Sequence, residues 1–345
     1  MRRFEHKKEV IQSLTEAQKI AFAPLTFQAI NSMLELGILK LIDLNPDCDL
    51  ESELNLSEYT VNTLLETAEA AGIVKREGRK YFVTALGKAF LYDEMTRVNF
   101  NFVKDVCYRG ADKLTESFLN EKPEGLKEYG FDGTIYPHIS TLPEKMKTSW
   151  FEFDHYYSDN SFDIIYKIIS PVEKIYDIGA NTGKFERVCL KYNSSQKLAL
   201  IDLPQNIDVI KDEPELKGCE FYPVDVLEKE QNLPKMSGAV IMSQFLDCFS
   251  KSQIEFILKK VSQASDDDIK IYILEPFIDR QKFAGAKFAL VHTSLYFTCM
   301  ANGCSKMYAF SDMEKIIEAA GLKINAVYDA LGAHDYTLLE CVKNA

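Results

Sequence analysis

Apolar side chains recur every three or four positions over residues 25–45, the spacing of one buried helix face. Gly37 interrupts this stretch, so we expect it to end one helix or to allow close packing. A second helical pattern starts after Ser57, a suitable N-cap, and stops at Gly72. The next segment reads as two short strands joined at Glu77–Gly78, followed by a new helix start. Helices followed by a β-hairpin predict a winged helix.

The helix that would read DNA in such a domain spans residues 60–71 and carries Glu66 and Glu69 without any Lys or Arg. Phosphate binding requires clustered basic side chains, and the whole chain has a formal net charge of −12. We therefore expect no nucleic-acid partner, and we interpret residues 1–100 as a protein–protein or dimerisation module.

Aromatic residues are concentrated between residues 100 and 165, where the chain's single tryptophan, Trp150, lies. The pattern predicts a helical connector over residues 101–165. Two interpretations of its aromatic side chains stay open. They form core between two domains, or the segment WFEFDHYYSDNSF lines a pocket for a planar ligand, because aromatic rings offer large contact areas.

From Val172 onward the pattern becomes a strand, a glycine-containing turn, a helix and a second strand that ends in Asp202. The turn contains Gly179 and Gly183, which allow close approach of a ligand or a positive φ angle. An acid at the end of the second strand can accept hydrogen bonds from both ribose hydroxyls. Together these features predict a nucleoside-binding βαβ unit.

The sequence of the turn, DIGANTG, distinguishes between cofactors. A dinucleotide site would have a glycine at the middle position, where this chain has Asn181. Asp177, close to the turn, would repel a pyrophosphate but suits a cationic ligand with an amino-acid head. The turn therefore favours a cationic nucleoside over NAD.

Further strands are expected within residues 219–230, 237–249 and 268–279, then a helix over 310–322 and a final pair of strands. This order predicts an α/β fold, with a Rossmann-like domain over residues 166–345 preceded by the α-rich winged helix. Ligands of such sheets bind at the carboxyl ends of the strands. Five acids fall at or just beyond these ends: Asp177, Asp202, Asp225, Asp247 and Glu275.

The segments ELGILKLI, AAGIVKREGRKYFVTALGKAF, DIGANTG and LIDLP resemble those of the plant and bacterial O-methyltransferase family. The resemblance implies a class I methyltransferase that uses S-adenosyl-L-methionine (SAM), a small aromatic substrate and a homodimer formed through the N-terminal domain. It implies that Asp225 holds the adenine amino group. It also places these residues beside the cofactor: Tyr157, Asp177, Gly179, Gly183, Asp202, Leu203, Val226, Ser243 and Gln244. The segments QFLDCFSKSQI and FDHYYSD look like those of methyltransferases from aryl-polyene and flexirubin-type pigment pathways.

The chain departs from this family where the general base is expected. A histidine usually follows the fourth strand there, and this sequence has Asp247 in its place and Phe249 in place of a tryptophan. Glu275 matches one of two acids that orient the base, while the second has no counterpart in NGCSKMYAF. An ordinary aspartate is about six pKa units less basic than a phenolate, so Asp247 needs burial to act as a base, or it orients a phenol by hydrogen bonding.

Two histidines are alternative candidates for the base. His292 lies in a helix whose family counterpart faces the acceptor, and we favour it by position; His155 lies in the FDHYYSD segment. Three reactions stay open: O-methylation of a small phenol, C-methylation of a ring beside a hydroxyl, and a family member that binds SAM without methyl transfer. A SAM-sensing transcriptional regulator is the alternative from another class.

The remaining composition fits a cytoplasmic protein. The eight cysteines contain no CxxC pair, which predicts neither a zinc site nor a disulfide framework. The N-terminal segment MRRFEHKKEV has no apolar core typical of a secretory signal. Lys287 and His292 interrupt the apolar stretch 283–300, which we interpret as a core or pocket-lining helix rather than a membrane span.

Overall fold

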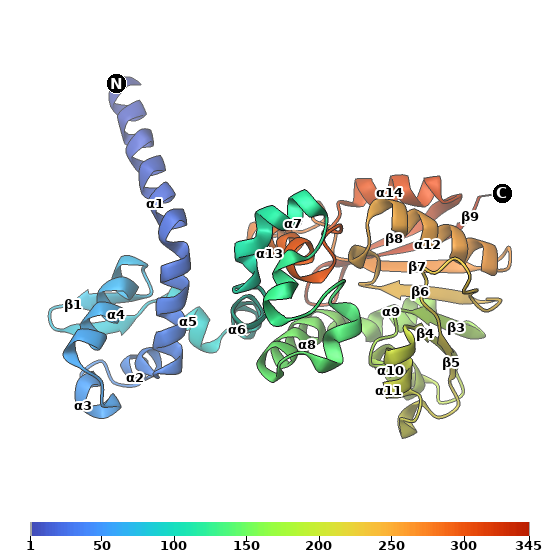
Figure 1. Ribbon diagram of the computed structural model, residues 1–345, viewed down its shortest axis with the longest axis horizontal. Helices are drawn as coiled ribbons and strands as arrows, with labels where there is room; N and C mark the ends of the chain where they lie inside the picture. Colours follow the sequence, from blue (N-terminus) through green and yellow to red (C-terminus); the bar gives the residue numbers. More distant parts are fainter. Residues whose placement is uncertain (1, 345) are drawn as a thin grey trace. The chain divides into compact units, whose positions relative to one another are not determined.

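The computed structural model describes residues 2–344, and the chain divides into two compact units, Met1–Asn99 and Phe100–Ala345 (Figure 1). The first unit is helical with one β-hairpin. Its elements are α1 (Arg2–Glu35), α2 (Ile38–Leu44), α3 (Leu50–Leu54), α4 (Glu58–Ala70), β1 (Val74–Glu77), β2 (Lys80–Val83), α5 (Ala85–Tyr92) and most of α6 (Glu94–Phe102).

Local sequence signals account for the boundaries in this unit. Gly37 adopts a left-handed conformation (φ 75°) between α1 and α2. The Ser57 side chain accepts a hydrogen bond from the backbone N–H of Thr60 (3.1 Å), which caps α4 as expected. Glu77 pairs with Lys80, so the hairpin turn lies one residue later than the sequence predicts. Gly87 packs so closely on the Ile73 carbonyl that a Cβ atom would lie 2.3 Å from its oxygen.

Helix α1 begins much earlier than the apolar pattern indicates, at Arg2. Its first 25 residues expose an apolar stripe at helical spacing, formed by Ile11, Leu14, Phe22 and Leu25. Helix α4 exposes Glu66 and Glu69, in agreement with an acidic rather than a basic surface.

The second unit starts with short helical segments that surround a pair of helices from the C-terminal half. These segments are η1 (Val103–Cys107), η2 (Gly110–Lys113), α7 (Leu114–Asn120), η3 (Glu124–Tyr129), η4 (Tyr136–Thr141), α8 (Glu144–Ser158), η5 (Asp159–Ser161) and α9 (Phe162–Ile169). They pack with α13 (Ala284–Tyr296) and η8 (Phe297–Ala301) around a core that includes Phe102, Met146 and Tyr296. About half of the aromatic side chains between residues 100 and 165 belong to this core, and the Phe102 ring stacks on the Phe153 ring at 3.9 Å.

A seven-stranded sheet forms the rest of the unit, in the order β5-β4-β3-β6-β7-β9-β8. Neighbouring strands are parallel except that β9 is antiparallel to both β7 and β8. The strands are β3 (Lys174–Ile178), β4 (Lys197–Asp202), β5 (Glu220–Pro223), β6 (Ala239–Ser243), β7 (Lys270–Glu275), β8 (Leu322–Leu331) and β9 (Tyr336–Lys343). This is the expected α/β fold with a mixed sheet.

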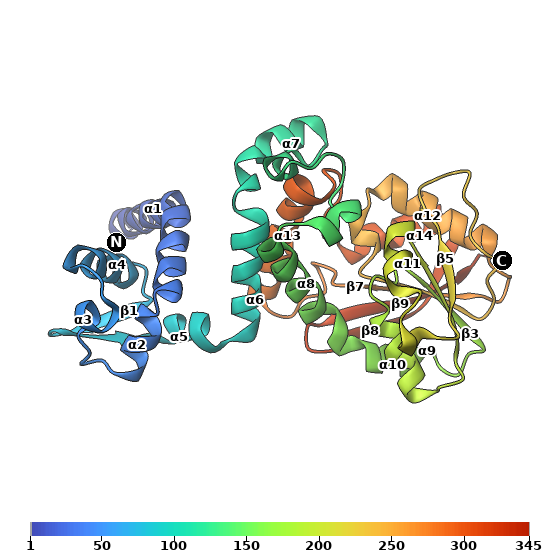
Figure 2. The ribbon, with the colours of Figure 1, turned by 60° about the horizontal axis from the view of Figure 1, so that its bottom comes forward.

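Helices cover both faces of the sheet (Figures 1 and 2). One face packs against α12 (Lys251–Ala264) and α14 (Phe310–Ala319). The other packs against α9, α10 (Lys184–Tyr192) and α11 (Pro204–Ile210). Two short segments, η6 (Pro214–Leu216) and η7 (Leu246–Cys248), lie in connections between the strands and helices. Both faces of the sheet are thereby buried, which explains the nearly continuous apolar strands.

Within residues 2–344, no single helix is long and apolar enough to cross a membrane. The bent pair Lys7–Glu35 and Ile38–Leu44 meets the length and composition criteria together. The expectation that 283–300 is a core or pocket-lining helix holds only for its end, from Tyr296 onward. Phe283 and Phe288 are exposed, whereas η8 is buried.

Candidate active site

A cavity of about 590 Å³ opens at the carboxyl ends of the central strands. One part of its wall comes from the glycine turn and the ends of β4 and β5, and another from η4, α8 and the loop after β6. Of the predicted site residues, the cavity wall brings together His155, Asp177, Gly179, Asp202, Leu203, Asp225, Val226, Ser243 and Gln244.

The two glycines of the turn have different functions. Gly179 has φ 87°, and a Cβ atom there would lie 2.3 Å from the Phe245 ring, so the site needs its bare backbone. Gly183 has φ 71° at the start of α10, but it faces Leu216 and does not line the cavity. Its role is to shape the turn and to pack, which corrects its assignment as a cofactor contact.

Asp202, the last residue of β4, is held in one orientation by three donors. The backbone N–H of Asn181 donates to Oδ2 (2.8 Å), and the N–H of Leu203 (2.7 Å) and Nδ2 of Asn206 (2.8 Å) donate to Oδ1. Burial raises the pKa of Asp202 despite these bonds. Two carboxylate oxygens offer about four acceptor positions, so capacity for a ligand's hydroxyl groups remains.

Asp177 lies on β3 beside Glu186, a residue that sequence reasoning missed. Glu186 is 1% exposed, and neither carboxylate oxygen has a hydrogen-bond partner in the described residues. Burial raises the pKa of both Asp177 and Glu186, and the proximity of Asp177 raises that of Glu186 further. Two buried carboxyl groups at such close range share a proton.

Buried polar atoms without partners lie beside the turn. The hydroxyl of Ser243 and Nε2 of Gln244 have no hydrogen-bond partner within the described part of the chain. Gln244 is held in a left-handed conformation (φ 48°), and its Oε1 accepts a bond from the Tyr336 hydroxyl (2.6 Å). Buried donors are normally satisfied, so these atoms indicate a polar ligand. Asp225 lies two residues beyond β5, where its Oδ1 accepts a bond from the N–H of Leu227 (2.9 Å).

The other part of the cavity wall is aromatic. Trp150 donates from Nε1 to the Tyr296 hydroxyl (2.8 Å), and Tyr136 accepts from Nδ2 of Asn302 (2.9 Å). Burial raises the pKa values of Tyr136 and Tyr296 well above their usual range. Their hydroxyls are therefore neutral hydrogen-bonding groups, in surroundings that suit a flat, apolar ring.

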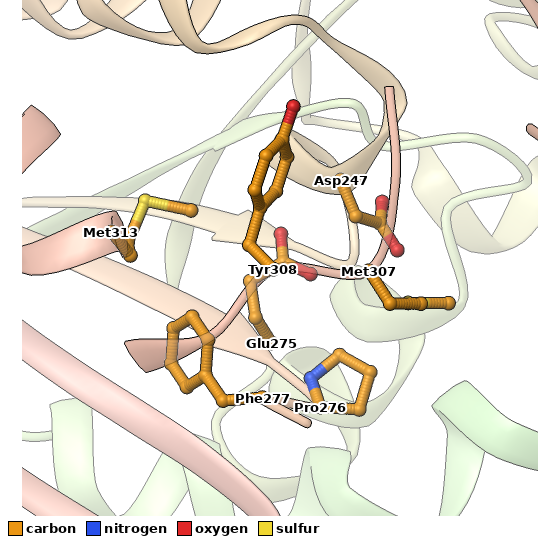
Figure 3. Close-up of a pocket in the computed structure, with 7 residues that line it drawn as sticks. All are labelled: Asp247, Glu275, Pro276, Phe277, Met307, Tyr308 and Met313. Carbon is orange, nitrogen blue, oxygen red and sulfur yellow. The ribbon is translucent and has the colours of Figure 1, made fainter. Parts of the chain in front are cut away.

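Asp247 and Glu275 face a small neighbouring cavity, together with Met307 and Tyr308 (Figure 3). Glu275 accepts bonds from the N–H groups of Phe245 (3.2 Å) and Leu246 (2.9 Å), so it fixes the loop after β6. Burial raises the pKa of Asp247, and the charge of Asp154 raises it further. Asp247 is 6% exposed and is not part of the large cavity's wall, although Cys248 and Gln244 are.

Two predicted site residues lie elsewhere. His292 is on the exposed side of α13, stacked on Phe288, with Nδ1 2.8 Å from the Phe288 carbonyl oxygen. It does not line the cavity, so our preference for it over His155 is corrected. Tyr157 packs against the rings of Phe153 and His334 instead of the cavity, because its side of α8 faces the core of the sheet.

Asp154 is a further wall residue that the sequence reasoning overlooked. Its Oδ2 accepts a hydrogen bond from Nδ2 of Asn181 (3.0 Å), and His155 Nδ1 lies 3.7 Å from the same oxygen. The resemblance covered the surrounding segment, FDHYYSD, but nothing in the spacing of one acid indicates that it faces a cavity.

The sequence also matches known families. Residues 14–81 match the Dimerisation2-like domain, and residues 111–323, well over half of the chain, match the O-methyltransferase domain. The chain belongs to the O-methyltransferase family. This O-methyltransferase is accordingly a SAM-dependent enzyme with an N-terminal dimerisation domain.

Solved structures share the fold over nearly the entire chain at low sequence identity. The mitomycin 7-O-methyltransferase is 16% identical, with a TM-score of 0.74 and coverage of 98% of this chain and 100% of that one. Human N-acetylserotonin methyltransferase, solved with SAM, is 14% identical (TM-score 0.65, 97% and 98% covered). An O-methyltransferase from neocarzinostatin biosynthesis, solved with S-adenosyl-L-homocysteine (SAH) and 1,4-dihydroxy-2-naphthoic acid, is 15% identical (TM-score 0.67, 92% and 96% covered). No curated protein sequence matches the chain.

The residues of this O-methyltransferase fit its cofactor. Asp202 offers acceptors for ribose hydroxyls, Gly179 leaves room beside the turn, and the cavity volume lies in the range of small-molecule sites. Asp177, together with the unpartnered Gln244 amide and Ser243 hydroxyl, lies where an amino-acid head with both charges would be held.

Proposed function

We propose that this enzyme transfers the methyl group of SAM to a hydroxyl group of a small hydroxyaryl acceptor. The observation that carries the proposal is one continuous cavity with two chemically different walls. Asp202 and the glycine turn form the polar wall, and Tyr136 and Trp150 contribute to the aromatic one. SAM supplies an electrophilic methyl group when bound. The remaining task of the protein is to align an acceptor oxygen with it and to remove the acceptor's proton.

The relative from neocarzinostatin biosynthesis, solved with a dihydroxynaphthoic acid, supports an acceptor of this class. In this chain, the aromatic rings offer stacking area, while the Tyr136 hydroxyl, which accepts a hydrogen bond from Asn302, can donate its proton to orient a phenol. Asp247 lies outside the wall of this cavity, and burial raises its pKa to about 7, which favours the protonated carboxyl group. Asp247 is therefore poorly suited to act as the general base that accepts the acceptor's proton.

The test is incubation of the purified protein with methyl-labelled SAM and a panel of phenols, catechols and hydroxynaphthoic acids. Mass spectrometry should find one added methyl group, and NMR should place the label on oxygen. A label on a ring carbon would replace O-methylation with C-methylation. SAH binding without transfer to any acceptor would contradict the proposal and favour a family member that binds the cofactor without methyl transfer.

We also propose that the enzyme is a homodimer formed through residues 1–99. Two observations support this: the match to a dimerisation domain and the exposed apolar stripe on α1. Such a stripe is costly in water, and a second copy of the same helix is a partner of matching chemistry.

A further inference from the structure

Asp154 lines the cavity, and the proposed reaction gives it no role so far. It lies on α8 four residues after Trp150, so both side chains project from the same face of the helix, and both line the cavity. The side chain of Asp154 is therefore next to the aromatic wall, where the acceptor ring would bind.

A hydrogen bond holds Asp154 against the glycine turn. Nδ2 of Asn181 donates to its Oδ2 (3.0 Å), while the backbone N–H of Asn181 donates to Asp202 (2.8 Å). One residue thus fixes the carboxylate of Asp154 relative to the nucleoside-binding acid. Within the described residues, Oδ1 of Asp154 receives no hydrogen bond, so this oxygen is available to a ligand.

Of the nearby basic side chains, Lys184 pairs with a different acid, and His155 lies between that acid and Asp154, with Nδ1 3.7 Å from Asp154 Oδ2. Lys184 Nζ lies 2.6 Å from Asp159 Oδ2, and His155 Nδ1 lies 3.6 Å from Asp159 Oδ1. A close ion pair would keep Asp154 ionised but would make it a weak proton acceptor. Because Lys184 pairs directly with Asp159, its charge lowers the pKa of Asp154 only in part and does not outweigh the effect of burial.

We propose that Asp154 is the catalytic residue that accepts the proton of the acceptor hydroxyl group; this rests on the proposed O-methylation. The acceptor O–H bond breaks and the proton moves to Oδ1 of Asp154. The acceptor oxygen forms a bond to the methyl carbon, whose bond to sulfur breaks with the electron pair remaining on sulfur. The products are the methyl ether, SAH and a protonated Asp154.

The surroundings of Asp154 bring its proton affinity closer to that of a phenolate. Burial raises the pKa of Asp154 above its ordinary value, and the charge of Asp159 adds to this, while His155 and Lys184 lower it. The charged and titratable groups that face it from the surrounding elements are His155 on α8, Asp159 on η5, Lys184 on α10, Asp247 on η7, Tyr296 on α13 and Tyr336 on β9.

Asp247 is the competing candidate for the proton-accepting residue, and its position is less suitable for contact with the acceptor. It faces the small cavity next to Glu275, whereas Asp154 faces the large one. Burial and the charge of Asp154 favour its protonated form. In this arrangement, Asp247 is a protonated neighbour of Asp154 and not the group that accepts the proton.

The experiment compares the full-length wild-type protein with Asp154→Asn and Asp247→Asn. The acceptors are catechol and 4-nitrocatechol, because the nitro compound is largely ionised at the assay pH and needs little help from a base. Asp154→Asn should lower kcat on catechol by about 10²–10⁴-fold and on 4-nitrocatechol by less than about tenfold. Its SAH dissociation constant, measured by calorimetry, should change by less than about threefold.

Two further readouts test the role of the residue. The acid limb of the kcat–pH profile should disappear in Asp154→Asn and persist in Asp247→Asn, which replaces a protonated carboxyl group with a neutral amide. Equal losses on both catechols would overturn the proposal. SAH binding weakened by more than about tenfold in Asp154→Asn would make it a cofactor ligand instead. A wild-type protein that binds SAH but methylates no acceptor would contradict both this inference and the proposed function.

Discussion

The acids around the glycine turn differ in what surrounds each carboxylate. Asp202 is held by three N–H donors, which keeps an oriented acceptor at the end of β4. Asp177 lies beside a second buried carboxyl group, Glu186. The first arrangement serves ligand binding, and the second stores a proton at a cost in folding stability at neutral pH.

Replacement of Asp202 should weaken cofactor binding. Asp202→Ala removes charge-assisted hydrogen bonds of about 1.5–3 kcal/mol each, so SAH should bind on the order of 100-fold more weakly. Isothermal calorimetry measures this, with Asp208→Ala on the exposed side of α11 as control. An unchanged dissociation constant for Asp202→Ala would refute the assignment of the nucleoside site.

Glu186→Gln should stabilise the protein at neutral and alkaline pH. Because the folded-state pKa of Glu186 is raised, its stabilising effect is full at low pH and is lost as pH rises toward the folded-state value. The amide avoids this loss and can donate to Asp177. We expect a gain of about 1–3 kcal/mol at pH 8, seen as a higher Tm, and little difference near pH 4. The same gain at both pH values would contradict the shared-proton interpretation.

Sequence reasoning identified acids where the pattern itself gave their position. Asp202 ends a strand that the apolar run defines, so its place at the edge of the sheet followed directly. Asp154 and Glu186 lie on helices, where the residues that face a cavity depend on packing partners far away in the chain. The same dependence explains why His292 was misplaced.

Between the elements, close backbone packing holds the helical part of the second unit together. Gly110 in η2 contacts Gly125 in η3, and an added Cβ atom on Gly110 would lie 2.1 Å from Met300 Sδ and 2.9 Å from the Gly125 oxygen. The segments η2 and η3, together with η8, which contributes Met300, come close because neither glycine has a side chain. They support the region from which Tyr136 and α8 reach the cavity.

Gly110→Ala should therefore destabilise the enzyme, because the extra methyl group overpacks a filled contact. We expect a loss of about 1–3 kcal/mol in unfolding free energy, measured by urea denaturation. Gly285→Ala on α13 is the matched control, since a Cβ atom there meets nothing within 4 Å. The control should be neutral or slightly stabilising; an equal loss in both variants would contradict the packing argument.

The sequence predicted best the elements in which apolar residues form a regular pattern. The strands β3, β4, β6 and β7 are apolar runs that end at turn residues or acids. The short segments between Val103 and Thr141 gave no period, because single helical turns are stabilised by contacts such as that of Gly110 with Gly125. The first half of α1 was not predicted, because it is too polar overall to show a clear helical pattern of apolar residues.

At the scale of the whole molecule, the expected assembly is a homodimer. Sedimentation should give about twice the chain mass of 39.3 kDa. The double variant Leu14→Glu and Phe22→Glu places charges in the apolar stripe and should lower the dimer's affinity by at least about 100-fold. Ser13→Glu, on another side of α1, should leave the dimer intact. A wild-type monomer, or an unaffected double variant, would contradict the proposed interface.

Asn181 links both substrate sites, because its backbone N–H holds Asp202 and its side chain holds Asp154. In thermodynamic terms, the two binding events share a coupling free energy, and each ligand must alter the affinity of the other by the same factor. Calorimetric titration of catechol with and without SAH, repeated with Asn181→Ala, would measure that factor. A glycine in this position, as in a dinucleotide site, would leave the two halves of the cavity without this connection.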